Sequence, residues 1–248
     1  MSLKPRLDTA LPPGNDGPCF DDLQVIDDLA PHPGPVNMAL DEVLLAESSG
    51  RWPVLRFYRW TVPTVSFGYF EPAADARRLA AGRPVVRRMT GGGLVEHGDD
   101  VTYTLVVPRP TPFVNFRSTE SYRLIHAAVA SALAHGGLLV RSHPGNPAPG
   151  PAGDGNACFR QPVLHDLTTD GHKVAGGAQR RTRAGLLHQG SVRLGDAAPP
   201  GWADALRAAL PAVLARQYAQ RRFTADEIER ARTLAAVRYA AAAWADRR

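Results

Sequence analysis

The chain lacks the features that mark several common classes of protein. Only two of its 248 residues are cysteines, Cys19 and Cys158, which is too few for a disulfide scaffold. It contains no run of about 18 apolar residues, so we expect no membrane span. Its first residues, MSLKPRLDTALPPGNDGP, have no apolar core of the kind found in secretory signals. These absences together predict a protein of the reducing cytoplasm.

Signs of nucleic-acid or metal binding are also few. The formal net charge of +5, from 29 basic and 24 acidic residues, could attract either nucleic acid or an acidic protein. The sequence has no basic run interleaved with aromatic residues and no zinc-finger spacing. His165, His172 and His188 show no metal-ligand spacing with one another or with Cys158. We therefore expect no nucleic-acid partner and no bound metal, and we assign polar or packing roles to these histidines.

The apolar residues predict a folded chain in which strands and helices are interspersed. They make up 44% of the sequence, which is ordinary for a protein with a buried core. Apolar segments bounded by turn residues predict strands at 53–60, 64–70, 84–89, 101–107 and 185–194, and a hairpin at 163–178 that turns at Asp170–Gly171. Helical spacing predicts helices at 36–48, 72–82, 118–137, 201–217 and 224–244. This order, without strict alternation, is typical of an α+β fold with a mostly antiparallel sheet.

Proline, glycine and capping residues predict the boundaries within the chain. Residues 1–30 read as a loose lead, and 31–248 as a single domain. Residues 144–156, PGNPAPGPAGDGN, predict a long loop. Pro211 should kink or divide the helix that contains it. Thr224 and Glu227 have the spacing of a capping box, which predicts the start of the last helix.

The stretch RRMTGGGLVEHGDD, residues 87–100, has two interpretations. Three consecutive glycines remove side chains, so backbone N–H groups could touch a ligand, with Arg87 and Arg88 supplying positive charge and His97 a polar contact. Alternatively, the stretch is a glycine-rich connection between two strands with its arginines in solvent. It is not a phosphate-binding P-loop, because no Gly-Lys-Ser/Thr follows.

A second stretch, NACFRQPVLHDLTTDGHKVAGGAQRR, also carries candidate site residues. Lys173 follows the hairpin turn, and Gly176 and Gly177 thin the strand behind it, so the lysine could hold a carbonyl oxygen, a carboxylate or a phosphate. Cys158 could act as a nucleophile if a nearby ammonium lowers its pKa. The alternatives are a solvated lysine beside a turn and a buried, inert cysteine.

Four motifs, taken in order, resemble a known family. VNMALDEVLL, RRMTGGGLVEHGDDVTYTLVVP, GHKVAGGAQRR and HQGS together look like the lipoate-protein ligase A and octanoyltransferase family. The resemblance covers about Asn37 to Ser191 and extends more weakly through the last helix. It implies the α+β fold shared with biotin-protein ligase catalytic domains, in which a large mixed sheet is flanked by helices.

The resemblance also implies a set of site residues. In the family the glycine stretch lines the acyl-chain pocket, and the lysine of the second motif contacts the reacting group. Carried over by motif, the catalytic residues are Cys158 and Lys173, and the acyl- or substrate-binding residues are Arg87, Arg88, Gly91, Gly92, Gly93, His97, Gly176, Gly177 and Ala178. The chain departs from the family pattern at Gly177, where a serine is common.

The family divides by chemistry, and the motifs favour one branch. Cysteine-dependent octanoyltransferases carry an Ala-Cys-Phe before the lysine hairpin, and here NACF stands at 156–159. This branch needs no cofactor, takes octanoyl groups from acyl carrier protein, and delivers them to lipoyl domains or glycine cleavage H protein. The alternatives are an ATP-dependent lipoate-protein ligase, which would need ATP and Mg²⁺, a biotin ligase as a weaker variant, and a non-catalytic paralogue that binds an acyl group or a lipoyl domain. Nothing in the sequence demands a second copy, so we expect a monomer.

Overall fold

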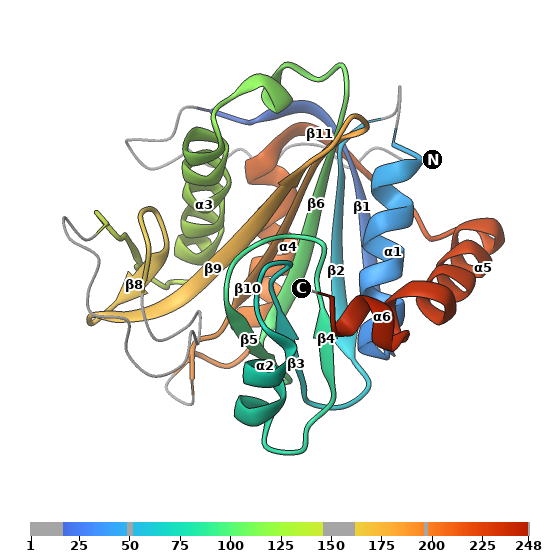
Figure 1. Ribbon diagram of the computed structural model, residues 1–248. Helices are drawn as coiled ribbons and strands as arrows, with labels where there is room; N and C mark the ends of the chain where they lie inside the picture. Colours follow the sequence, from blue (N-terminus) through green and yellow to red (C-terminus); the bar gives the residue numbers. More distant parts are fainter. Residues whose placement is uncertain (1–16, 49–51, 146–161, 196–197, 248) are drawn as a thin grey trace.

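The computed structural model describes residues 17–48, 52–145, 162–195 and 198–247 (Figure 1). Its centre is an eight-stranded sheet, and only two of the strand pairings in it, β11 with β1 and β1 with β2, are parallel. The strand order across the sheet is β11 (Ala215–Gln220), β1 (Phe20–His32), β2 (Val54–Trp60), β6 (Val101–Pro108), β10 (Gly185–Val192), β9 (His172–Arg181), β8 (Leu167–Thr169) and β7 (Arg141–Ser142). The predicted α+β fold with a large, mostly antiparallel mixed sheet flanked by helices is confirmed.

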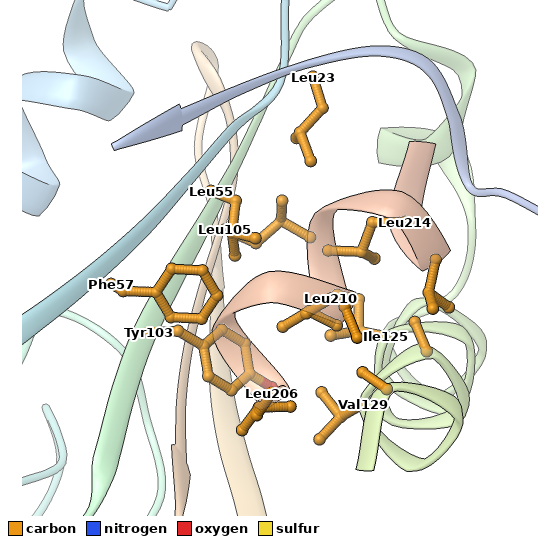
Figure 2. Close-up of a cluster of buried hydrophobic side chains, with 14 of the residues drawn as sticks. Leu23, Leu55, Phe57, Tyr103, Leu105, Ile125, Val129, Leu206, Leu210 and Leu214 are labelled. Atoms are coloured by element: carbon orange, nitrogen blue, oxygen red, sulfur yellow. The ribbon is translucent and has the colours of Figure 1, made fainter. Parts of the chain in front are cut away.

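One face of this sheet is covered by α3 (Ser118–His135) and α4 (Trp202–Leu214) (Figure 2). Because side chains alternate along a strand, Leu55 and Phe57 of β2 point into this layer, together with Tyr103 and Leu105 of β6. They pack with Ile125, Val129, Leu206, Leu210 and Leu214 of the two helices. Each such side chain contributes about 1.5–3 kcal/mol when fully buried.

The opposite face is covered by α1 (Gly34–Ala46) and by the C-terminal segment. This segment consists of α5 (Ala225–Leu234), a π-helical turn at Ala235–Tyr239 and the short α6 (Ala242–Ala245). The capping box of Thr224 and Glu227 is present at the start of α5, as predicted. The predicted single helix over 224–244 is wrong beyond Leu234, since the π-helical turn and Ala241 in extended conformation separate α5 from α6.

A smaller sheet beside the large one holds the glycine stretch. Its strand order is β4 (Val85–Arg87), β3 (Thr64–Phe67) and β5 (Leu94–His97), and α2 (Ala73–Ala80) packs on it. The three glycines connect β4 to β5 across β3. A 3-10 turn at Pro112–Asn115 precedes α3.

Two further predictions are corrected by the structure. Residues 1–30 were expected to form a loose lead, but β1 begins at Phe20, and Leu23 and Val25 are buried in the core at alternate positions. The helix predicted at 201–217 ends at Leu214, and residues 215–220 form β11 beside β1. Pro211 lies in the last turn of α4 and does not divide it.

The predicted hairpin turn is present at Asp170 and Gly171. Their φ angles of 48° and 79° are both positive, as a tight two-residue turn requires. Among the described helices, none combines the length and the apolar character needed to cross a membrane. The predicted loop at 144–156 lies outside the described residues from 146 onward.

Candidate active site

The four sequence motifs meet at one narrow, mostly apolar cavity. The cavity encloses about 450 Å³ of empty space, part of it open to solvent. Strands β9 and β10 form one wall. The rest comes from β2, β3, β5, the start of β6, the start of α1 and the residue that follows β4. Its lining residues are Met38, Tyr58, Trp60, Ser66, Arg88, Val95, His97, Thr102, Lys173, Gly176, Gly177, Ala178, Gln189, Gly190 and Ser191.

Lys173 contributes an ammonium group to this cavity. Its Nζ lies 2.7 Å from Oδ2 of Asp166, and the two side chains are 4% and 0% exposed. A Cβ at Gly176 would lie 2.6 Å from the same Nζ, so in this arrangement the end of the lysine side chain occupies space that the glycine leaves free. Lys173 is one of only two lysines in a chain with 29 basic residues, the other being Lys4.

Ser66 and His97 also line the cavity, and they form a hydrogen-bonded chain with Asp100 behind them. The Ser66 hydroxyl lies 2.6 Å from Nε2 of His97, and Nδ1 of His97 lies 2.8 Å from Oδ2 of Asp100. Arg88 donates to the Ser66 oxygen at 2.7 Å, and Trp60 stacks on the His97 ring at 4.1 Å. Burial alone would raise the pKa of Asp100, but the His97 contact and hydrogen bonds from Ser191 and Gly98 hold that pKa well below 3.8.

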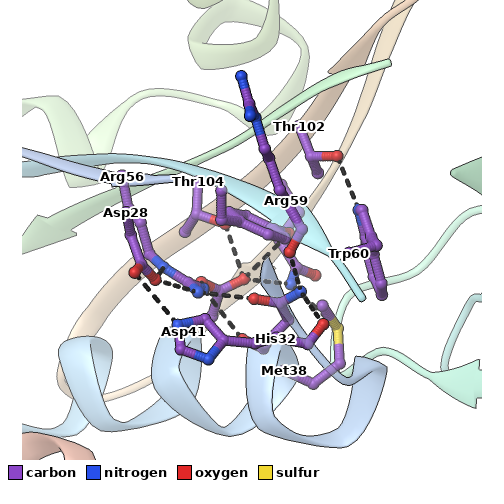
Figure 3. A network of polar contacts seen from close by, with 12 residues as sticks. Asp28, His32, Met38, Asp41, Arg56, Arg59, Trp60, Thr102 and Thr104 are labelled. Atoms are coloured by element: carbon purple, nitrogen blue, oxygen red, sulfur yellow. Dashed lines mark hydrogen bonds and ion pairs between the residues drawn. The ribbon is translucent and has the colours of Figure 1, made fainter. Parts of the chain in front are cut away.

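A second polar network behind the cavity joins the helix motif to the glycine motif and to HQGS. Asp41 of α1 accepts hydrogen bonds from Thr104 and from Gln189, each at 2.7 Å. Gln189 in turn accepts a hydrogen bond from Thr90, next to the three glycines. Figure 3 shows the inner part of this network, where Arg56 lies between the carboxylates of Asp28 and Asp41. Because Asp41 is fully buried, loss of Arg56 would leave the Asp41 carboxylate as a buried charge without its cation.

The three glycines fold back against β3 instead of lining the narrow cavity. A Cβ at Gly68 would overlap the carbonyl oxygen of Gly92 and lie 2.8 Å from its carbon. Gly68 also donates to the Gly93 carbonyl, and Arg88 donates to the carbonyls of Gly91 and Gly93 at 3.0 Å. Gly92 has a φ of 82°, a backbone conformation that favours glycine. In this stretch the glycines thus allow the backbone at 91–93 to lie against the backbone at Gly68.

A wider and more open cavity adjoins the narrow one. It encloses about 840 Å³ of empty space and is lined by Gly91, Gly92, Ser118, Thr119, Tyr122, Val163, Leu164, Gly177, Ala178 and Gln179. Gly177 and Ala178 line both cavities, so these two residues of β9 mark the place where the cavities meet.

His188 explains the glycine at position 177. A Cβ at Gly177 would lie 2.6 Å from Cε1 of His188, which is fully buried behind β9. Burial holds the pKa of His188 well below its usual value, and burial lowers the pKa of neighbouring His126 to about 4. Both rings are therefore neutral near pH 7, and His188 occupies the space that a side chain at 177 would need.

The structure does not bring all of the predicted site residues together. Arg88, His97, Lys173, Gly176, Gly177 and Ala178 meet at the narrow cavity, and Gly91 and Gly92 line the wider one. Gly93 is in neither lining. The Arg87 guanidinium points away from both cavities, to carbonyls of the 68–71 segment and of Trp244, Ala245 and Arg247. Cys158 lies outside the described residues.

Sequence reasoning missed Ser66, Asp100, Tyr122, Asp166 and Gln189. Asp100 lies in the glycine motif and Gln189 lies in HQGS, so their positions within these motifs could have indicated a role in the site. Tyr122 and Asp166 come from α3 and from the turn before β8, and nothing local in the sequence marks them.

Comparisons with known proteins identify the fold and the family of the chain. A chain of the bi-partite lipoate protein ligase structure from Thermoplasma acidophilum matches with a TM-score of 0.69 at 20% identity, covering 91% of this chain and 96% of that one. The fold is therefore that of lipoate-protein ligases. The lipoyl protein ligase A/B catalytic domain model matches residues 33–220, and the chain belongs to that family. The resemblance inferred from the four motifs is thus confirmed.

Two curated relatives are more similar in sequence. Octanoyltransferase LipM of Kyrpidia tusciae is 39% identical over 173 residues, which are 64% of this chain and 61% of that protein. Octanoyltransferase LipM of Oceanobacillus iheyensis is 36% identical over 171 residues, which are 66% of this chain and 61% of that protein. The chain thus spans about three fifths of the length of these relatives.

Proposed function

We propose that the protein is an octanoyltransferase of protein lipoylation that works through a cysteine acyl-enzyme. It takes an octanoyl group from the thioester of acyl carrier protein and delivers it to a lysine of a lipoyl domain or of glycine cleavage H protein. The observation that carries the proposal is the narrow apolar cavity with the Lys173 ammonium in its wall. An apolar cavity of this kind suits a medium-length acyl chain whose carbonyl is held by a cation.

The sequence and its relatives support the choice of a transferase. NACF at 156–159 places Cys158 before the lysine hairpin, as in the cysteine-dependent branch. The relatives described above carry the name octanoyltransferase. The transferase needs no cofactor, because the thioester bond of the donor already holds the energy that a ligase would take from ATP.

The reaction has two steps, both at the acyl carbonyl carbon. In the first, Sγ of Cys158 bonds to that carbon, the carbon–sulfur bond of the donor breaks, and the carrier thiol leaves with a proton. In the second, the acceptor lysine amine attacks, the bond to Cys158 breaks, and the cysteine recovers its proton. The Lys173 ammonium favours the thiolate of Cys158 and stabilises the oxyanion in both steps.

The two cavities suit the two parts of the donor. The narrow cavity takes the acyl chain, and the wider cavity takes the arm that joins the acyl group to its carrier. Their junction at Gly177 and Ala178 then lies beside the reacting carbonyl. The net charge of +5 favours docking of acidic carriers.

The test is the intact mass of the protein after mixing with octanoyl-acyl carrier protein in the absence of ATP. We expect the wild type to gain one octanoyl group and Cys158→Ala to gain none. Cys19→Ala is the matched control, since Cys19 packs against the hydrophobic core, and it should gain the group like the wild type. No mass gain in the wild type, together with lipoate transfer that requires ATP and Mg²⁺, would identify a ligase instead.

A further inference from the structure

A buried tyrosine links the counter-ion of Lys173 to the backbone where the two cavities meet. The Tyr122 hydroxyl donates to Oδ1 of Asp166 at 2.5 Å, and it accepts the backbone N–H of Gly177 at 2.9 Å. The other carboxylate oxygen of Asp166 binds Lys173 and accepts the N–H of Val163 at 2.7 Å. One carboxylate and one phenol thus connect α3, the turn before β8, and β9.

From this geometry we propose that Tyr122 and Asp166 act as positioning residues, a clamp that fixes the Lys173 ammonium and the Gly177 backbone relative to each other. The inference rests on the proposed function for its catalytic consequence, although the clamp itself is a structural arrangement. Neither clamp residue needs to touch the reacting atoms, because both act through Lys173 and Gly177.

The topology explains why β9 needs an added contact at this point. Strand β9 pairs with β10 along one edge through Gly176, Gly177 and Ala178. Its other edge pairs with β8 only as far as Ala175. Among the described strands the Gly177 N–H therefore has no partner on that side, and the Tyr122 oxygen accepts it instead. Because residues 176 and 177 are glycines, the backbone there has more conformations open to it. A fixed acceptor for the Gly177 N–H reduces their number.

The clamp also determines the direction of the lysine. A lysine has four rotatable carbon–carbon bonds, and a buried ion pair selects one arrangement only where the anion is itself held in place. Asp166 is held by Tyr122 and Val163, and it is fully buried. The Tyr122 hydroxyl stays protonated, since burial and the nearby Asp166 raise its pKa, and so it remains the donor to that carboxylate.

The lysine content of the chain allows a direct test that does not depend on activity. Lys173 and Lys4 are the only lysines in the sequence, so labelling with an amine-reactive acetylating reagent reports on two side chains, with Lys4 as internal reference. In Tyr122→Phe and Asp166→Asn we expect the Lys173-to-Lys4 labelling ratio to rise at least threefold. Loss of a buried hydrogen bond should increase, by roughly that factor, the fraction of molecules in which the Lys173 amine can reach the reagent. Tyr239→Phe is the matched control, because it removes another largely buried phenol–carboxylate bond, of 2.7 Å to Glu42, far from Lys173 in the sequence.

A double-mutant cycle then tests the link to catalysis. Tyr122→Phe should lower the single-turnover rate of octanoyl transfer on the order of tenfold, with KM for the carrier changed less than about twofold. In a Lys173→Ala background the same change should have almost no further effect, because the clamp acts through the lysine. Tyr239→Phe should leave the rate unchanged in both backgrounds.

The outcomes separate the clamp from the proposed function. An unchanged labelling ratio in both clamp variants would overturn the clamp, whether or not the wild type transfers octanoyl groups. An equal loss of rate in the wild-type and Lys173→Ala backgrounds would also overturn it, since that pattern indicates general destabilisation. A raised ratio in a protein that forms no acyl-enzyme would support the clamp and refute the octanoyltransferase.

Discussion

Gly68 and Gly92 lie in backbone contact, so that a Cβ on Gly68 would overlap the carbonyl oxygen of Gly92. The end of β3 and the glycine stretch are thereby fixed against each other. The stretch RRMTGGG, which the sequence presents as a possible flexible turn, is one half of a tight backbone junction. Gly68, which the motif does not include, is the other half.

This contact predicts that Gly68→Ala is severely destabilising. Backbone atoms cannot move aside as a flexible side chain can, so we expect the free energy of unfolding to fall by about 3 kcal/mol or more. Gly91→Ala is the control, because a Cβ at Gly91 would meet no atom of the described residues within 4 Å and its φ is not positive. Urea denaturation of both variants measures the difference, and similar losses in the two would contradict the close contact.

The environment of Arg87 predicts a structural effect on the C-terminal segment. Its guanidinium donates to carbonyls of Trp244, Ala245 and Arg247 on one side and of Tyr69 and Glu71 on the other. Arg87→Met should leave these acceptors without a donor and lower the free energy of unfolding by about 2–4 kcal/mol. The Trp244 indole also donates to the Arg87 carbonyl, so tryptophan fluorescence and protease cleavage near residue 244 should report the release.

Arg78→Met is the control for this prediction, since its guanidinium is exposed and pairs only with Asp75 of the same helix in the described contacts. It should change stability by less than about 0.5 kcal/mol. A Trp244 environment unchanged by Arg87→Met would contradict the structural role.

His126 predicts a pH dependence of stability on the acid side of neutrality. Burial lowers its pKa from 6.5 to about 4 in the folded protein, so between these values the unfolded chain binds more protons than the folded one. Stability must therefore rise with pH in this window and fall as the pH is lowered. From pH 7 to pH 5 the loss from this residue amounts to about 2 kcal/mol.

The variant His126→Asn tests this directly. Asparagine keeps a donor for the His165 carbonyl, which Nδ1 of His126 contacts at 2.8 Å, but it does not titrate. Free energies of unfolding at pH 7 and pH 5 should differ less in the variant than in the wild type. An identical pH dependence in both proteins would show that His126 is not buried in its neutral form.

The contact between positions 177 and 188 predicts a paired effect. Gly177→Ser places a Cβ against the His188 ring and should destabilise the protein by about 1–3 kcal/mol. His188→Ala alone should also destabilise, because it leaves a cavity. The double variant should be more stable than the sum of the two losses predicts, by about 1 kcal/mol or more. Strict additivity in thermal or urea unfolding would refute the contact.

The motifs allowed much of the site to be predicted, but not the direction of individual side chains. Arg87 and Arg88 are neighbours at the end of one strand, so they point to opposite sides: Arg88 to the cavity and Arg87 to the C-terminal segment. A motif places both near the site and cannot tell them apart. Sequence spacing likewise cannot show that Tyr122 and Asp166 meet, because 44 residues separate them and only the packing of α3 on β9 brings them together.

The fold was predicted well wherever apolar periodicity was strong. The prediction failed for β1, where the acidic residues Asp22, Asp27 and Asp28 interrupt the apolar pattern. The Asp28 charge is compensated by Arg56, a residue of another strand, so the burial of this segment depends on a distant partner. Residues 215–217 were misassigned to a helix for a similar reason, since it is pairing with β1 that makes 215–220 a strand.

The position of β1 between β2 and β11 has a consequence for biosynthesis. β1 leaves the ribosome first among the described strands, while β11, which completes its pairing, is the last of them to be made. Until then one edge of β1 stays open, and an open strand edge is a template for pairing with other chains. The pairing of β11 with β1 is therefore a late step in folding. It joins segments far apart in the sequence, and such long-range pairing is slow. Chains that stop before residue 215 should consequently aggregate even though every motif of the active site has already been made.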